Sequence, residues 1–287
     1  PRPTLTQSSA ASDVYKRQGI IFEILWGLLP IVGVSGTSFV MLLIICAIFE
    51  KNIYVKTVVP ILFIGLLLFG PGHYQKISEE NSGLTVTVVQ PENLGLDGLI
   101  ELTNKADSNI VVWPEASAWY TGNAFGTNKR IIGGFFRREE SKTFTAVIDA
   151  SNGEGYNKHN LVPFGEFQPF GDLLIGINSF FNIPNSRISR GAFVQDKLNW
   201  SGLVCWELVF NNTFIERAKG TEFIVHVSND SWYGSSMPAQ HLKHARARSV
   251  ESNKCVVRTT TDGLSQIFSP QNDQSSKLLN RKEDGSI

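Results

Sequence analysis

Two uncharged apolar runs near the start of the chain constrain its fold more than any other feature. The first covers residues 32–49 and the second covers residues 57–72, and neither contains Asp, Glu, Lys or Arg. A helix needs about 20 apolar residues to cross a bilayer. Two such runs in succession favour two transmembrane helices over two buried helices of a soluble protein. The apolar segment 19–30 is shorter and contains Glu23, so we expect part of a span or a re-entrant piece there.

The loop between the two runs indicates how they are oriented. It contains Lys51 and Lys56, and short loops that carry Lys or Arg tend to stay on the cytoplasmic side of the membrane. The second helix is then expected to run outward, which places the rest of the chain on the far side of the membrane, in the periplasm if the source is a Gram-negative bacterium. The sequence therefore predicts a multi-pass membrane protein, which in such a bacterium would lie in the inner membrane with its catalytic domain in the periplasm.

The chain divides into five predicted parts. Residues 1–18 are polar and Ser-rich, and we expect a non-native or disordered tail there. Residues 19–74 hold the membrane segments, and residues 75–83 form a polar linker. Residues 84–270 are long enough for one catalytic domain, and residues 271–287 are expected to be a polar tail.

Short β-rich runs alternate with helix-compatible segments within residues 84–270. Strands interleaved with helices predict a layered α/β domain. The expected helices include residues 96–105 and 240–252. The expected strands are residues 84–89, 110–113, 130–136, 144–149, 202–205 and 223–227.

Charge and cysteine usage exclude several classes of function. The formal net charge is +0, so no basic field favours nucleic acid as a partner. The three cysteines are Cys46, Cys205 and Cys255, and their spacing suits neither a disulfide framework nor a zinc cluster. Cys255 is expected to be a buried structural thiol. Only Cys205 has neighbours suited to chemistry.

Two of the candidate reactive residues precede Cys205 in the sequence. Glu115 follows an apolar run and Pro114, so we expect it at the end of a strand, where reactive groups of α/β domains gather. Lys158 precedes the segment 161–166, an apolar loop with Pro and Gly that ends in Glu166 and resembles a rigid clamp. Alone, Glu115 is more simply a solvated turn residue and Lys158 a surface lysine.

Cys205 completes the set. It follows the apolar run 202–204 and precedes Trp206 and Glu207. In a strand, Glu207 would lie on the same face as Cys205. A free cysteine in a strand is more often an inert core residue. A carboxylate, an amine and a thiol in this order nevertheless supply a base, an oxyanion stabiliser and a nucleophile. Those are the groups needed to cleave an acyl bond through a thioester.

At these residues the chain resembles the carbon–nitrogen hydrolase (nitrilase) superfamily. The membrane segments and the Lys-x-x-Leu-Val-Pro-Phe-Gly-Glu loop are similar to its apolipoprotein N-acyltransferase branch, as is the segment 228–234. The resemblance implies a four-layer αββα sandwich preceded by transmembrane helices. It also implies that Glu115 is the general base, Lys158 the stabiliser of the tetrahedral intermediate and Cys205 the acylated nucleophile.

Three supporting residues complete this comparison. Glu166 and Glu207 match two further glutamates of the family's site, and Trp206 stands where the family usually has tyrosine. No tryptophan occurs near residues 89–93, where the family commonly carries one above the site. The family also has more spans before this region and one after it, so we expect a fragment or a shortened relative.

The resemblance implies a specific acyl transfer. The acyl group would pass from a phospholipid, through a cysteine thioester, to the diacylglyceryl-modified N-terminal cysteine of an apolipoprotein. No cofactor or metal is expected; the expected partners are these two substrates and the lipid bilayer, and the expected oligomeric state is a monomer. Two alternatives remain open: a membrane-tethered amidase or nitrilase that hydrolyses a C–N bond, and an inactive membrane-anchored binding relative.

Overall fold

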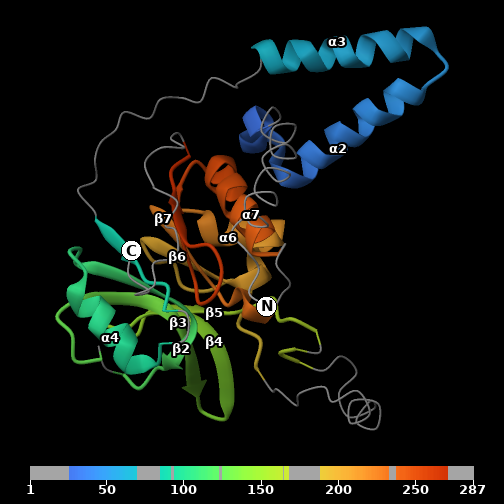
Figure 1. Cartoon of the computed structure of the whole chain (residues 1–287). Coiled ribbons are helices and arrows are strands. Elements are labelled where there is room, and N and C mark those ends of the chain that lie inside the picture. The colour runs from blue at the N-terminus through green and yellow to red at the C-terminus, as the bar shows by residue number, and fades with distance from the viewer. Residues whose placement is uncertain are drawn as a thin grey trace, which may run out of the picture. The chain divides into compact units, whose positions relative to one another are not determined.

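The computed structural model describes residues 26–69, 85–91, 94–122, 125–163, 165–167, 188–232 and 237–270. The chain forms two compact units, Pro1–Glu80 and Asn81–Ile287 (Figure 1). The predicted tails 1–18 and 271–287 lie outside the described residues, and so do residues 19–25 and 70–84, which include the whole predicted linker 75–83.

The first unit contains the short 3-10 helix η1 (Trp26–Leu28) and the helices α2 (Leu29–Phe49) and α3 (Ile53–Phe69). Gly33, with φ of 67°, kinks α2 near its start, a conformation that glycine adopts without steric cost. Among the described residues, α2 is the one helix that is long and apolar enough to cross a membrane, judged by length and composition. Helix α3 is shorter, at 17 residues, and it begins before the predicted run 57–72.

Most apolar side chains of α2 are exposed and do not pack into a core. Of the 18 residues in its most apolar stretch, 11% are buried, and Phe49 at its end is 81% exposed. Large apolar side chains of α3, such as Leu62, are exposed as well. Contiguous exposed apolar surface of this kind is costly in water and is suited to a lipid or protein partner.

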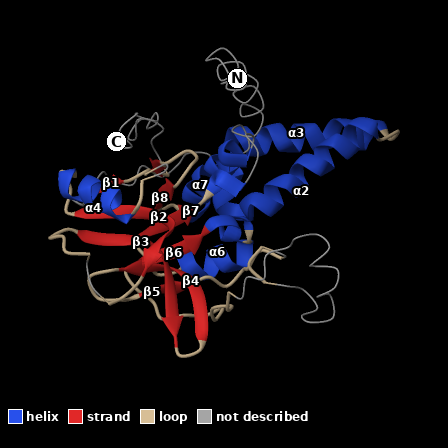
Figure 2. Ribbon diagram, turned by 60° about the horizontal axis from the view of Figure 1, so that its bottom comes forward, coloured by secondary structure: helices blue, strands red, loops and turns tan. Residues whose placement is uncertain are grey.

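The second unit contains two mixed sheets (Figures 1 and 2). The first sheet has the order β1 (Val86–Val88), β2 (Ile110–Trp119), β3 (Arg130–Glu139), β4 (Lys142–Asp149) and β5 (Gly155–Asn157). The second has the order β6 (Trp200–Val204), β7 (Phe223–Ser228), β8 (Cys255–Thr260) and β9 (Gln266–Phe268). In the first sheet, β1, β2 and β3 are parallel, β4 is antiparallel to β3, and β5 is antiparallel to β4. In the second sheet, β6, β7 and β8 are parallel, and β9 is antiparallel to β8.

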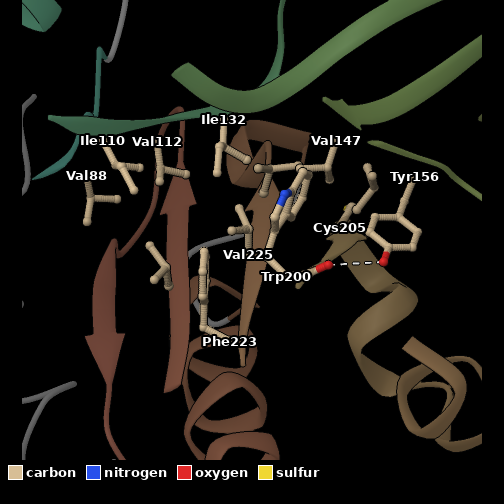
Figure 3. Packing of buried hydrophobic residues seen from close by; sticks show 13 residues of the cluster. Val88, Ile110, Val112, Ile132, Val147, Tyr156, Trp200, Cys205, Phe223 and Val225 are labelled. Atoms are coloured by element: carbon tan, nitrogen blue, oxygen red, sulfur yellow. Dashed lines mark hydrogen bonds between the residues drawn. The ribbon is translucent and has the colours of Figure 1, made fainter. Parts of the chain in front are cut away.

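The two sheets pack face to face through a shared apolar core (Figure 3). Side chains alternate along β2, so Ile110 and Val112 enter this core while Val111 and Trp113 point to the opposite face. From the second sheet, Val225 and other alternate residues of β7 complete the core. The period-2 pattern of apolar residues thus specifies two buried faces for each sheet.

Helices cover the two outer faces. Helix α4 (Leu96–Lys105) packs Leu99 and Leu102 against the first sheet. Helices α6 (Asn211–Ala218) and α7 (Met237–Ser252) cover the second sheet, as Figure 2 shows. The result is a four-layer α–β–β–α sandwich, which confirms the expected fold class.

Hydrogen bonds also join the two sheets directly. The Tyr156 hydroxyl donates to the carbonyl of Trp200 at 3.0 Å (Figure 3). The Thr259 hydroxyl donates to the carbonyl of Val89 at 2.8 Å. Buried hydrogen bonds at defined points fix the register of one sheet on the other, because a shift would leave polar groups unpaired.

Candidate active site

Glu115 lies inside strand β2, not at its end, which corrects the expectation drawn from Pro114. The register between β2 and β3 shifts between Trp113 and Ala118, and Ala116 has φ of 57°. On β3, a Cβ added to Gly134 would lie 2.4 Å from the Cα of Glu115. The absence of a side chain at Gly134 therefore makes room for a bulge that directs Glu115 out of the regular ladder.

The Glu115 carboxylate is nearly buried and has two defined neighbours. Its Oε2 accepts a hydrogen bond of 2.8 Å from the backbone N–H of Asn229, and its Oε1 lies 3.6 Å from the Lys158 Nζ. Burial raises the pKa of Glu115, and the Glu166 charge adds to this, although Lys158 and the Asn229 N–H oppose it. A carboxylate with a raised pKa is suited to accept a proton near neutral pH.

Lys158 follows β5 directly, and its backbone is held on both sides. Its N–H donates to the Thr145 carbonyl at 2.8 Å, and its carbonyl accepts from the Gly191 N–H at 2.7 Å. The side chain is buried, which by itself lowers the pKa of Lys158, but the charges of Glu115 and Glu166 outweigh burial and raise it above its usual value. Lys158 is therefore an ammonium at any physiological pH.

Glu166 fixes the direction of that ammonium. Its Oε1 lies 2.7 Å from the Lys158 Nζ, and its Oε2 accepts a hydrogen bond from the Val162 N–H at 2.8 Å. One carboxylate therefore holds both the lysine and the loop that follows it. Phe164, within the same predicted clamp, lies outside the described residues.

Cys205 stands at the turn after β6, in the core between the sheets (Figure 3). It has φ of 54°, and it begins the 3-10 helix η3 (Cys205–Val209). A non-glycine residue in the left-handed region is uncommon and typical of functional sites. Burial and the Glu115 charge raise the pKa of the Cys205 thiol to about 12, while the Lys158 charge and the Ser228 hydroxyl oppose this increase. The resting side chain is therefore a thiol.

Glu207 does not share a strand face with Cys205, contrary to expectation, because the strand ends at Val204 and Glu207 lies in η3. Its carboxylate is buried and accepts three backbone hydrogen bonds. Oε1 accepts from the N–H groups of His159 at 2.7 Å and Asn160 at 3.0 Å, and Oε2 accepts from Val204 at 3.0 Å. Glu207 thus ties the segment after Lys158 to the turn that carries Cys205.

Trp206 lies next to Glu207 and contacts the same loop segment. Its indole N–H donates to the Asn160 carbonyl at 3.1 Å, and its ring meets Phe210 edge to face with centroids 5.0 Å apart. The partly buried ring therefore has a fixed position beside Cys205.

A buried polar chain behind Cys205 was not predicted from the sequence. His226 Nε2 lies 2.8 Å from the Cys205 carbonyl oxygen, and His226 Nδ1 lies 2.8 Å from Arg258 Nη1. Arg258 Nη2 donates to Asp230 Oδ2 at 2.5 Å. Because arginine only donates, His226 must accept at Nδ1, and its Nε2–H then donates to Cys205.

The charge states of these buried polar residues follow from burial together with their hydrogen bonds and neighbouring charges. Burial and the Arg258 charge hold the pKa of His226 well below its usual value, so the imidazole is neutral. The pKa of Asp230 is about 2, because hydrogen bonds from His241 and Ser228 and the Arg258 charge outweigh burial. The sequence signals that could have revealed this chain are His226 and Arg258, two polar residues inside apolar strand segments.

The remaining thiols and possible metal ligands add little to this site. Cys255 is exposed, contrary to the expectation of a buried thiol. Within the described ranges, no group of three His, Cys, Asp or Glu side chains is arranged to hold a metal ion. The structure thus brings the charged or ionisable groups of Glu115, Lys158, Glu166 and Cys205 close enough to act on one another. The hydrogen bonds of Glu207 join the segment after Lys158 to the turn that carries Cys205.

Comparison with known proteins identifies the family of this chain. A family model described as carbon-nitrogen hydrolase matches residues 128–283. A curated apolipoprotein N-acyltransferase of Vibrio parahaemolyticus is 37% identical over 191 residues, which cover 56% of this chain and 38% of that protein. A protein of the same name from Photobacterium profundum is 30% identical over 295 residues, which cover 87% of this chain and 57% of that protein.

The chain therefore spans about four to six tenths of the length of these curated relatives. A CN-hydrolase superfamily protein of known structure from Xanthomonas campestris is 16% identical, with a TM-score of 0.48, and covers 67% of this chain and 85% of that chain. The family model alone matches more than half of the sequence. The chain belongs to the carbon–nitrogen hydrolase family.

Proposed function

We propose that the chain carries the reaction centre of an apolipoprotein N-acyltransferase. The observation that carries this proposal is the cluster formed by the Glu115 carboxylate, the Lys158 ammonium and the Cys205 thiol. The names of the curated relatives support the type of acyl transfer. No cofactor is needed, because every proton and electron pair can be handled by these three side chains and the two substrates.

The first half of the reaction forms a thioester. Glu115 accepts the thiol proton, and the Cys205 sulfur attacks an ester carbonyl carbon of a phospholipid. The Lys158 ammonium stabilises the oxyanion of the tetrahedral intermediate. When the intermediate collapses, the C–O bond breaks, Glu115 returns the proton to the leaving oxygen, and a lysophospholipid departs.

The second half transfers the acyl group to an amine. The α-amine of the diacylglyceryl-modified cysteine attacks the thioester carbonyl, and Glu115 accepts a proton from the nitrogen. Lys158 again stabilises the oxyanion. The C–S bond breaks, an amide forms, and the proton on Glu115 returns to the sulfur. Because an amide is more stable than a thioester, this step needs no nucleotide.

The apolar helix α2 supports a membrane location for this chemistry. Both proposed substrates carry acyl chains, and each buried CH₂ contributes about 0.8 kcal/mol to membrane binding. The exposed apolar surface of α2 suits the same hydrocarbon phase. We place the protein in the bacterial inner membrane as a multi-pass monomer, with the second unit on the periplasmic side because Lys51 and Lys56 favour a cytoplasmic loop.

Intact mass spectrometry tests the proposal. The detergent-solubilised full chain is incubated with phospholipid, and the mass of one acyl group is expected on the wild type and on the Cys255→Ala variant, which removes an exposed thiol. Cys205→Ala is expected to gain no acyl mass. An equal gain by Cys205→Ala, or no gain by the wild type, contradicts the proposal.

The acceptor is tested in a second step. Adding a diacylglyceryl-modified peptide with a free α-amine is expected to discharge the acyl-enzyme and give an N-acyl peptide. Release of free fatty acid in place of that amide would identify water as the acceptor and favour a membrane-tethered hydrolase. A Cys205 that forms no acyl-enzyme and resists alkylation in the folded protein would favour an inactive binding relative.

A further inference from the structure

Ser228 lies beside Cys205 because of the register between two parallel strands. Val204 on β6 pairs with Val227 on β7, so the next residues along the two strands, Cys205 and Ser228, are neighbours at the same sheet edge. The Ser228 side chain is buried and donates a hydrogen bond of 2.7 Å to Asp230 Oδ1. The same hydroxyl also acts on the Cys205 thiol, whose pKa it lowers.

Asp230 has two further partners besides Ser228. Its Oδ2 accepts from Arg258 at 2.5 Å, and its Oδ1 lies 3.1 Å from His241 Nδ1. Both contacts keep the carboxylate satisfied if the hydroxyl turns away. A hydroxyl has one proton and can rotate about its C–O bond, so Ser228 can serve either acceptor but not both at once.

We propose that Ser228 is a catalytic residue whose hydroxyl turns from Asp230 to the Cys205 sulfur when the thiol gives its proton to Glu115. The inference rests on the proposed role of Cys205 as nucleophile. One proton moves from sulfur to the Glu115 carboxylate, and the Ser228 proton stays on its oxygen and only exchanges acceptors. The hydroxyl returns to Asp230 when the sulfur becomes part of the thioester, and it turns again when sulfur leaves in the second half-reaction.

The surroundings of the sulfur explain why such a donor is needed. The charges of Glu115 and Glu166 and burial disfavour the thiolate, whereas the charge of Lys158 favours it. Arg258 also acts on the sulfur from β8, but its guanidinium is engaged with Asp230 and His226. Lys158 is required at the oxyanion. Ser228 therefore supplies a donor at the sulfur without taking the cation away from the substrate.

The rate at which iodoacetamide alkylates Cys205 tests the inference without any lipid. The full chain is alkylated in detergent between pH 6 and 9, and peptide-resolved mass spectrometry separates Cys205 from the exposed Cys46 and Cys255. Ser228→Ala is expected to lower the Cys205 rate by about three- to tenfold at each pH, the effect of one lost hydrogen bond to a thiolate.

Ser201→Ala is the matched control. Ser201 is an equally buried serine on β6, and its hydroxyl has no hydrogen-bond partner among the described residues. Cys205 of the Ser201→Ala variant is expected to be alkylated at the wild-type rate. A Ser228→Ala protein that keeps its unfolding temperature and also alkylates at the wild-type rate overturns the inference.

An isosteric pair at the same position gives an independent comparison, even if Ser228→Ala does not fold. Ser228→Thr and Ser228→Val have the same shape and differ in the hydroxyl, so any steric disturbance is common to both. Cys205 is expected to be alkylated at least threefold faster in Ser228→Thr than in Ser228→Val, and equal rates overturn the inference. Iodoacetamide needs no acyl donor. A wild type that accepts no acyl group from lipid therefore contradicts the proposed function, while the alkylation rates still test the role of Ser228.

Discussion

The Glu115 carboxylate accepts a 2.8 Å hydrogen bond from the backbone N–H of Asn229, which lies 114 positions further along the chain. Glu115 belongs to β2 of the first sheet, and Asn229 follows β7 of the second. The proposed general base is therefore held by the sheet that carries the proposed nucleophile. Its position therefore depends on how the two sheets pack against each other.

Gly134→Ala is expected to displace Glu115. The added methyl group would lie 2.4 Å from the Glu115 Cα, which is backbone and cannot turn aside. Because small misplacements of reacting groups cost up to about 100-fold in rate, we expect acyl-enzyme formation to slow at least tenfold. Gly95→Ala, whose methyl group meets nothing within 4 Å, is the control and is expected to keep the wild-type rate. Equal rates for both variants would contradict this account of the bulge.

The pH dependence of acyl-enzyme formation should report the raised pKa of Glu115. The base must be unprotonated, so the rate is expected to fall tenfold per pH unit once the pH drops below that pKa. The fall should begin above the range of an ordinary glutamate, because burial raises this pKa. Lys158, whose pKa is raised, stays charged and should cause no loss up to pH 10. Single-turnover rates measured from pH 4 to 10 check this, and an acid limb at or below the ordinary glutamate range would count against it.

Glu207→Gln should weaken both the fold and the site. The carboxylate accepts three backbone N–H bonds, whereas an amide has one oxygen and presents an NH₂ group to the remaining donors. We expect the free energy of unfolding to fall by about 2–4 kcal/mol, measured by urea titration. Glu101→Gln, which removes an exposed i,i+4 ion pair with Lys105, is expected to leave the free energy of unfolding nearly unchanged. Similar effects of the two variants would show that Glu207 is not a structural tie.

Asp230→Asn should destabilise the protein in a pH-dependent way. Removing the charge leaves Arg258 buried without its counter-ion, which costs about 3–5 kcal/mol. The pKa of Asp230 is about 2, so its contribution to stability is complete above the ordinary aspartate pKa and is lost as the pH falls through about 2. The difference in unfolding free energy between wild type and variant should therefore shrink between pH 4 and 2. A difference that grows on acidification would contradict the assignment.

The sequence predicts regular elements well where the apolar pattern is simple. The bounds 96–105 of α4 match the prediction because Leu99 and Leu102 mark one helical face. Strand β8 (Cys255–Thr260) was missed because Arg258 and its neighbouring threonines interrupt the apolar pattern. Those polar residues are buried through partners far away in the sequence, such as Asp230 and Val89, which no local pattern reveals.

The candidate site shows the same division. The residue types and their order indicated Glu115, Lys158 and Cys205, and the structure brings these three side chains together. Their local conformations could not be predicted. The bulge at Glu115 depends on Gly134 of the next strand, and the 3-10 turn that places Glu207 beneath the site depends on backbone donors of the Lys158 segment. Both are tertiary effects.

The close packing of two sheets made from successive stretches of chain has a consequence during biosynthesis. All of the strands that hold Glu115 and Lys158 emerge from the ribosome before β6 to β9. A partly synthesised chain thus has a carboxylate and an ammonium but no thiol held against them. By the proposed mechanism such an intermediate cannot form a thioester, and the site is complete only when the last strands pack against the first sheet.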